Sequence, residues 1–161
     1  MTIIRTEKVN NGEILFALPE GFHVMSREER NALYKGAEDL QDTFGILDSG
    51  NGTALHIAWK KKPFLLGSIA SMDAVRDTTE RRTKNVIPGY TDMGHTEREM
   101  GGQKLCGFKY GFTAQDGPRV CEHLLIRHKR YIYTLICAAR ADKAEYAEEA
   151  LREILKATTL A

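Results

Sequence analysis

The sequence predicts an α+β domain, a three-layer α/β/α sandwich around a twisted, mainly antiparallel sheet. Residues 104–139 read as three strands separated by tight turns at Asp116-Gly117 and Lys129-Arg130. Both faces of this meander are apolar, whereas an antiparallel sheet with one face in water alternates apolar and polar residues. Helices are therefore expected on both faces. One face collects Cys106, Phe108, Tyr110, Phe112, Cys121, Leu125, Ile132 and Ile136, and the other Leu105, Val120, Leu124, Ile126, Tyr133, Leu135 and Cys137.

The first elements are a short strand and a short helix. Residues 13–18 form the strand, which stops at the turn Pro19-Glu20-Gly21. Ser26 then opens the helix, because Glu29 three residues later can return a hydrogen bond to it and complete a capping box. Gly36 suits the left-handed position that ends such a helix.

The next segment predicts a hairpin and a second helix. Residues 43–47 and 53–60 are strands joined by the turn Asp48-Ser49-Gly50-Asn51-Gly52. Ser71 caps the helix, although residues 64–70 could supply an earlier turn, and Pro88-Gly89 ends it. Its thin apolar stripe consists of Met72, Val75, Thr79 and Val86.

The second half predicts the meander and a closing helix. Residues 93–99 are a polar strand near an edge, followed by the Gly101-Gly102 turn and strands over 104–114, 119–127 and 131–139. The last helix covers residues 143–157 with Asp142 as its cap. Its buried stripe consists of Tyr146, Ala150, Leu151, Ile154 and Leu155.

The composition indicates one cytoplasmic domain over residues 1–161. The chain has 23 basic and 22 acidic side chains, a net charge of +1, which predicts no global field for nucleic acid or an anionic membrane. It shows neither an apolar run of ~20 residues nor a signal peptide. The odd number of cysteines, 3, predicts free thiols in a reducing compartment.

Cys121 and His123 are the most suggestive reactive pair. Residues two apart on a strand share a face, so these two side chains lie together while Glu122 points away. They could form a thiolate–imidazolium pair, which would require an accessible thiol of lowered pKa. No third group that would orient the histidine is visible, and a packed core thiol is the simpler interpretation.

The sequence shows no cofactor motif and no metal-ligand spacing. The five histidines are scattered, and His56, His95 and His123 could converge only if their strands were neighbours. No glycine-rich loop leads from a strand into a helix, so no nucleotide or other cofactor is expected. The basic clusters Lys60-Lys61-Lys62, Arg81-Arg82 with Lys84, and Arg127-His128-Lys129-Arg130 lack the interleaved aromatics of nucleic-acid surfaces.

Three blocks resemble one known family. They are Phe16-Ala17-Leu18-Pro19-Glu20-Gly21-Phe22 before a capped helix, Gly101-Gly102 leading into Gly107-Phe108-Lys109-Tyr110, and Lys129-Arg130-Tyr131-Ile132-Tyr133-Thr134-Leu135. In element order the chain is similar to the PsbP-like and Mog-type group, which joins the photosystem II protein PsbP, a Ran-binding import factor and bacterial proteins. The resemblance implies a sheet between helices and no shared active site, since known members act by binding other proteins. No functional residue is carried over from it.

Two functions from different classes follow. The first is a non-catalytic binding module that recognises another protein or itself, with Lys60, Lys61 and Lys62 as the contact surface where a strand runs into a loop. The alternative is a small enzyme or metal-binding protein with a site near Cys121 and His123. A self-associating structural protein is a third possibility.

Overall fold

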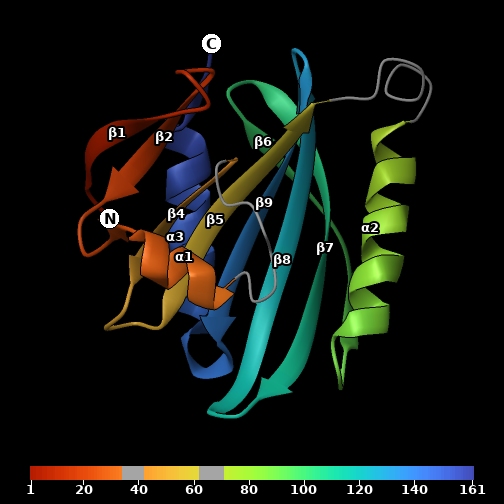
Figure 1. Ribbon diagram of the computed structural model, residues 1–161. Coiled ribbons are helices and arrows are strands. Elements are labelled where there is room, and N and C mark those ends of the chain that lie inside the picture. The colour runs from red at the N-terminus through yellow and green to blue at the C-terminus, as the bar shows by residue number, and fades with distance from the viewer. Residues whose placement is uncertain (34–41, 62–70) are drawn as a thin grey trace.

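The computed structural model describes residues 1–33, 42–61 and 71–161, and its strands form two antiparallel sheets (Figure 1). The larger sheet has seven strands in the order β3-β4-β5-β9-β8-β7-β6, and the smaller has three in the order β1-β2-β10. The larger sheet contains β3 (His23–Val24), β4 (Thr43–Asp48), β5 (Thr53–Lys61), β6 (Thr91–Met100), β7 (Gln103–Ala114), β8 (Gly117–His128) and β9 (Tyr131–Arg140). The smaller contains β1 (Ile3–Val9), β2 (Ile14–Pro19) and β10 (Thr159–Leu160).

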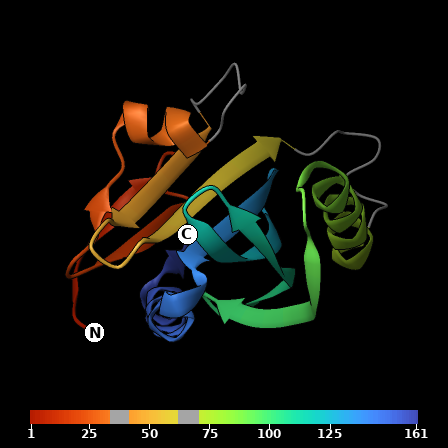
Figure 2. The same ribbon diagram turned by 90° about the horizontal axis from the view of Figure 1, so that it is seen from below.

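Helices cover both faces of the seven-stranded sheet, as the sequence predicts. Figure 2 shows α1 (Arg27–Leu33) and α2 (Met72–Val86) on one side and α3 (Ala144–Ala157) on the other. On the α2 side the buried cluster consists of Phe108, Tyr110, Cys121 and Leu125. On the α3 side the larger cluster joins sheet residues such as Leu105, Leu124, Tyr133 and Leu135 to α3 and to the small sheet. The expected three-layer α/β/α sandwich is confirmed.

The strand β6 forms an edge of the large sheet, in agreement with its polar sequence. It pairs with β7 on one side, and most of its side chains are exposed. Its register shifts between Asp92 and His95, where Gly94 has a φ of 93° and its N–H donates to the Asp92 carboxylate. Such a bulge bends an edge strand and discourages uncontrolled pairing with another sheet.

The two short-range helix caps are confirmed. The Ser26 hydroxyl accepts from the Glu29 N–H at 3.1 Å, and a Glu29 carboxylate oxygen accepts from the Ser26 N–H at 3.0 Å. The Ser71 hydroxyl accepts from the Ala74 N–H at 3.1 Å and starts α2. The expected helix end near Gly36 and the alternative turn over residues 64–70 lie outside the described residues.

The thin apolar stripe predicted on α2 packs against the sheet only at the start of the helix. Met72 and Val75 pack against the cluster beneath the helix, but Val86 is 73% exposed. The helix ends at Val86, and the N–H of Ile87 donates to the Thr83 carbonyl. Ile87, one residue beyond the helix, contacts the cluster instead.

The predicted cap of α3 is also wrong. Asp142 lies within a 3₁₀ turn over Ala141–Lys143, and Lys143 occupies the N-cap position without a side-chain hydrogen bond. The extra turn takes up the residues between β9 and α3, so the carboxylate is one position too early to cap the helix. The predicted buried stripe holds for Ala150, Leu151, Ile154 and Leu155, while Tyr146 is partly buried.

Three strands were not expected from the sequence, so α3 does not close the chain. β1 has mostly exposed side chains, and β3 and β10 have two residues each. Such segments carry too little periodicity to be recognised locally. Ala161 nevertheless donates its N–H to the Glu13 carbonyl at 2.8 Å, which fixes the C-terminal segment against β2.

The three cysteines, Cys106, Cys121 and Cys137, are free and buried, as the sequence predicts. In the described part of the chain, no helix has the length and apolar character needed to cross a membrane.

Candidate functional site

The strand β8 places Cys121 and His123 on the same face of the sheet, beneath the layer that contains α2. Cys121 lies opposite Tyr110 on β7, and His123 lies opposite Phe108. The Tyr110 hydroxyl is 3.0 Å from Nε2 of His123. Cys121 is 6% exposed and His123 8%. The structure therefore brings the predicted pair together and adds Tyr110, which the alternating strand pattern marked only as a core residue.

The environment of this pair opposes a reactive thiolate. Burial lowers the pKa of His123 to about 3, with a further contribution from His56, and burial raises the pKa of Cys121 to about 11. Both groups are therefore neutral at pH 7. A nucleophilic thiol would need the opposite shift of the Cys121 pKa. The accessible, activated thiol that the enzyme hypothesis requires is not what the structure contains, because the apolar cluster penalises charge.

Glu122 points to the opposite face, as expected, and joins an ion triad beneath α3. Arg98 on β6 contacts the carboxylates of Glu122 on β8 and Glu148 on α3, each through two hydrogen bonds. The Glu122 side chain is 4% exposed. This polar group links the sheet edge to the helix layer and is separated from Cys121 and His123 by the sheet itself.

The three strand histidines do not converge. His56 on β5 and His123 on β8 lie on one face with Ile136 of β9 between them, while His95 on β6 contacts Glu80 of α2. Burial lowers the pKa of His56 to about 4. Within residues 1–33, 42–61 and 71–161, no three His, Cys, Asp or Glu side chains are grouped so as to hold a metal ion.

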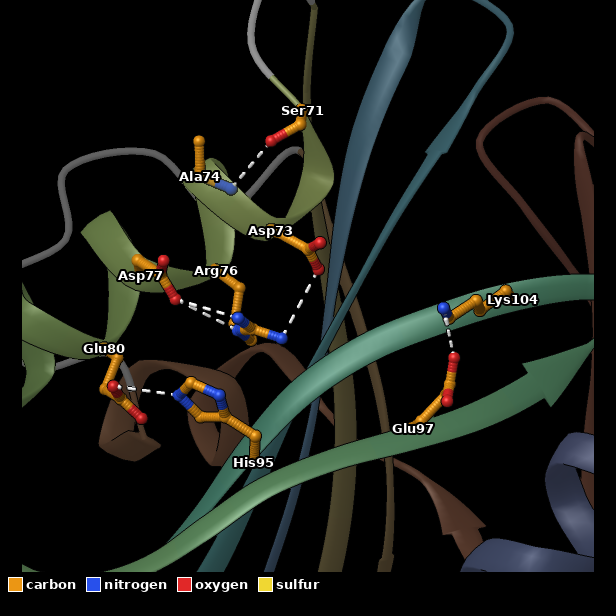
Figure 3. A network of polar contacts seen from close by, with 9 residues as sticks. All are labelled: Ser71, Asp73, Ala74, Arg76, Asp77, Glu80, His95, Glu97 and Lys104. Carbon is orange, nitrogen blue, oxygen red and sulfur yellow. Dashed lines mark hydrogen bonds and ion pairs between the residues drawn. The ribbon is translucent and has the colours of Figure 1, made fainter.

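A groove of about 260 Å³ lies between α2 and the β6–β7 edge, and ion pairs line it (Figure 3). Arg76 contacts Asp73 at 3.4 Å and Asp77 at 3.0 Å. His95 lies 3.2 Å from Glu80, and Lys104 pairs with Glu97 (Figure 3). Of these contacts, the one between His95 and Glu80 joins α2 to the sheet edge. Because opposite charges already face each other here, the groove presents little uncompensated charge to a ligand.

The basic residues predicted as a contact surface lie at the end of β5. Lys60 is opposite Ile132 and Lys61 opposite Tyr131 on β9. Both lysines are exposed, and Lys62 lies outside the described residues. β9 begins directly after the β8–β9 turn, so the two lysines lie beside the turn residues Lys129 and Arg130, which are also exposed.

The same strand end contains a fifth cation. Arg127 of β8 pairs in register with Ile132, which in turn pairs with Lys60. Figure 1 shows the end of β5 next to the turn between β8 and β9. We call this group the basic end; it consists of Lys60, Lys61, Arg127, Lys129 and Arg130. The sequence shows the two basic clusters, but only the pairing of β5 with β9 brings them together.

Four of the five cations of the basic end lack a counter-charge within the described part of the chain. Among the described residues, Lys60, Lys61, Lys129 and Arg130 form no ion pair, in contrast to the charged residues of the α2 groove. Lys129 also has a φ of 53°, a left-handed conformation that is unfavourable for a residue with a side chain. The conformation of Lys129 was not expected, because a lysine carries no local signal for it.

Comparisons with known proteins reveal similarity at the level of the fold. No family model matches the sequence, and no curated protein matches it. The cyanobacterial PsbP (CyanoP) from Synechocystis sp. PCC 6803 has a TM-score of 0.67 at 12% identity, over 100% of this chain and 94% of that one. LpqN, involved in cell envelope biogenesis of Mycobacterium tuberculosis, has a TM-score of 0.64 at 16% identity, over 91% of this chain and 82% of that one. The Saccharomyces cerevisiae Ran-binding protein Mog1p has a TM-score of 0.57 at 12% identity, over 97% of this chain and 94% of that one.

These similarities confirm the fold that the sequence blocks indicate. The chain has the PsbP/Mog-like fold, with the likeness extending over nine tenths or more of its length in each of the three structures. Identities of 12–16% show the fold alone.

Proposed function

We propose that this protein is a non-catalytic binding module whose partner is another protein, and that Lys60, Lys61 and Lys62 lie in the contact. The observation that carries the proposal is the register of β5 with β9, which sets Lys60 and Lys61 beside Lys129 and Arg130. A concentrated group of like charges in a chain of net charge +1 marks a surface for electrostatic recognition.

Two further observations support this function over chemistry at Cys121 and His123. One protein with the same fold, Mog1p, is a Ran-binding protein, so this architecture serves protein recognition in at least one case. The Cys121 thiol is buried and its pKa is raised, which removes the nucleophile that the alternative function would use. The proposal includes a cytoplasmic location, where the three thiols stay reduced.

The test is a pull-down from an extract of the source cells at physiological salt, with the purified chain as bait. The double variant Lys60→Glu/Lys61→Glu should lose the captured protein and its salt dependence. The matched control is Arg82→Glu/Lys84→Glu, which changes the net charge equally on the exposed surface of α2. Lys84 lies in the last turn of α2, away from the β8–β9 turn (Figure 1).

Two results would count against this function. Equal capture by the wild type and both variants would show that the basic end makes no contact. Absence of any captured protein, together with a monomeric mass in light scattering, would leave neither a partner nor self-association. A dimer that the Lys60→Glu/Lys61→Glu variant dissociates would identify a second copy as the partner.

A further inference from the structure

We propose that the pair Asn11-Gly12 is a site of spontaneous deamidation, in which the asparagine side chain becomes a carboxylate and the main chain partly isomerises. The sequence contains a second pair of this kind, Asn51-Gly52, in the turn between β4 and β5. The two pairs have the same local chemistry, so their structural surroundings decide which one reacts. We expect the first pair to react in the folded protein and the second to be protected. This modification is independent of the protein-binding function proposed above.

The reaction joins the main-chain nitrogen of Gly12 to the side-chain carbon of Asn11. The nitrogen loses its proton to solvent base and attacks Cγ, the bond from Cγ to Nδ2 breaks, and the leaving group takes up protons from solvent and departs as ammonia. Water then opens the five-membered succinimide. Opening at Cγ gives aspartate, and opening at the main-chain carbonyl carbon gives isoaspartate, whose main chain is one carbon longer. Glycine favours ring closure because it has no side chain to obstruct the attack and its backbone is conformationally free.

The groups that react are free at the turn between β1 and β2, which form an antiparallel hairpin (Figure 1). One hydrogen bond closes the turn, from the Glu13 N–H to the Asn10 carbonyl at 3.1 Å. Asn11 is exposed, and among the described residues neither its side chain nor the Gly12 N–H has a hydrogen-bond partner. A Cβ on Gly12 would have no neighbour within 4 Å. The turn therefore has room to change conformation for ring closure.

The second pair is held at each group that would react. Nδ2 of Asn51 donates to one carboxylate oxygen of Asp48 at 2.9 Å, and the Asn51 N–H donates to the other at 3.1 Å. The Gly52 N–H, which supplies the nucleophile, donates to the Ser49 carbonyl at 3.4 Å. A Cβ on Gly52 would lie 3.1 Å from Nε of Arg140, so this turn is also crowded. Ring closure here requires several hydrogen bonds to break, which slows the reaction.

Deamidation at the first pair adds a negative charge to a groove of about 410 Å³. Asn11 lines this groove together with Lys8 of the same hairpin and Asp42 beside β4. The new carboxylate lowers the net charge of the chain from +1 to zero. The product therefore separates from the parent protein in ion-exchange chromatography, and the groove becomes more acidic.

Isoaspartate also acts on the fold, because the turn is attached to the large sheet. Nδ2 of Asn10 donates to the Tyr133 hydroxyl at 2.8 Å, and that hydroxyl donates to Glu13 at 2.8 Å. An extra main-chain carbon between Asn11 and Gly12 shifts the two residues that make these bonds. In the described part of the chain, β1 pairs with β2 alone, so the turn helps to fix its register. We therefore expect isoaspartate to destabilise the hairpin.

The test follows both asparagines by peptide mapping and mass spectrometry, in folded protein kept at mildly alkaline pH and physiological temperature. Asn11 should react about tenfold faster than Asn51 or more, because freeing the second pair requires the loss of at least one or two hydrogen bonds. In the guanidinium-unfolded chain the two rates should agree within about threefold, since both asparagines precede glycine. Equal rates in the folded protein, faster reaction at Asn51, or no reaction at Asn11 while the unfolded chain reacts would each overturn the proposal.

Two variants test the assignment from opposite sides. Asn11→Gln keeps an amide but requires a less favourable six-membered ring, so reaction at this position should slow about tenfold or more. Asp48→Ala frees the second pair and should raise the rate at Asn51 about tenfold, with the rate at Asn11 unchanged. An unchanged rate at Asn51 in folded Asp48→Ala would contradict the protection assigned to these hydrogen bonds. The comparison of folded and unfolded wild type decides the matter if this variant does not fold.

The Tm separates the added charge from the isomerised main chain. Aged wild type rich in isoaspartate should melt roughly 2–4 °C below the fresh protein. Asn11→Asp carries the charge without the extra carbon and should lose about half of this or less. Asn11→Gln kept under the same conditions should retain its Tm. If it loses as much as the aged wild type, the damage lies elsewhere and the effect assigned to this turn is wrong.

Discussion

Arg98 on the edge strand β6 holds Glu122 on β8 through two hydrogen bonds, 2.9 Å from Nε to one carboxylate oxygen and 2.8 Å from Nη2 to the other. The strand β7 lies between the two residues in the sheet. The same guanidinium contacts both oxygens of Glu148 on α3 at 2.7 Å, and these bonds lower the pKa of that carboxyl. One side chain thus ties the edge of the sheet to the helix layer.

Removing Arg98 should therefore be costly, because it leaves the buried Glu122 carboxylate without its counter-charge. We expect Arg98→Ala to lower the free energy of unfolding by about 3 kcal/mol, measured by urea denaturation at pH 7. The control is Lys104→Ala, whose pair with Glu97 is largely exposed and contributes less than about 1 kcal/mol. Similar stabilities of the two variants would show that the triad is not a structural clamp.

The buried histidines predict acid sensitivity above the range in which carboxylates titrate. The pKa of His56 is lowered to about 4 and that of His123 to about 3, from 6.5, so unfolding exposes groups that bind protons more tightly. The contribution of the two histidines to the free energy of unfolding is fully present above their unfolded pKa of 6.5. It falls as the pH decreases toward the folded pKa values. Between pH 7 and pH 5, each histidine should lower the free energy of unfolding by about 2 kcal/mol.

This acid sensitivity can be measured as the urea unfolding free energy at pH 7, 6 and 5. His123→Phe keeps a ring against Phe108, whose ring centroid lies 4.7 Å from that of the imidazole. The variant should show about half of the wild-type pH dependence. A wild type that is equally stable at pH 7 and 5 would contradict the burial of two neutral imidazoles.

The Cys121 thiol should be inert in the folded protein. Its pKa is raised to about 11 by burial, so alkylation by iodoacetamide at pH 6–8 should be slow and should require opening of the structure. Peptide mapping by mass spectrometry separates it from Cys106 and Cys137, and the guanidinium-unfolded chain supplies the maximal rate. Rapid labelling of Cys121 at pH 6 would instead support the enzyme hypothesis.

Gly107 should tolerate no side chain, although it has an ordinary strand conformation. A Cβ at this position would lie 2.1 Å from the His123 carbonyl oxygen and 2.9 Å from Oγ1 of Thr96, because the neighbouring strands pack closely there. Gly107→Ala should lower the free energy of unfolding by about 3 kcal/mol or more. At Gly111 on the same strand the nearest atom would be 3.5 Å away, so Gly111→Ala should be nearly neutral in thermal unfolding. Equal melting temperatures for the two variants would refute the close packing.

The hairpin strands, the side-chain caps of α1 and α2 and the two-sided burial could all be predicted from the sequence, because each depends on residues close together in the chain. Ser26 and Glu29 are three residues apart, and the period-2 pattern of β7, β8 and β9 assigns Cys121 and Leu124 to opposite faces directly. The same locality explains the errors. Aspartate is a favoured N-cap residue, so Asp142 fits the local pattern of a helix start. The 3₁₀ turn before α3 instead depends on the position at which β9 ends.

The candidate site divides in the same way. The sequence alone determined that Lys60, Lys61, Lys129 and Arg130 are polar ends of strands and turns, and that Cys121 and His123 share a face. Only the tertiary structure decided that β5 pairs with β9, which places the two lysines beside the β8–β9 turn, and that Arg98 reaches Glu122 across β7. The physical reason is that strand order arises from pairing between distant segments, where many arrangements satisfy the same local pattern and the packing of the whole core selects one.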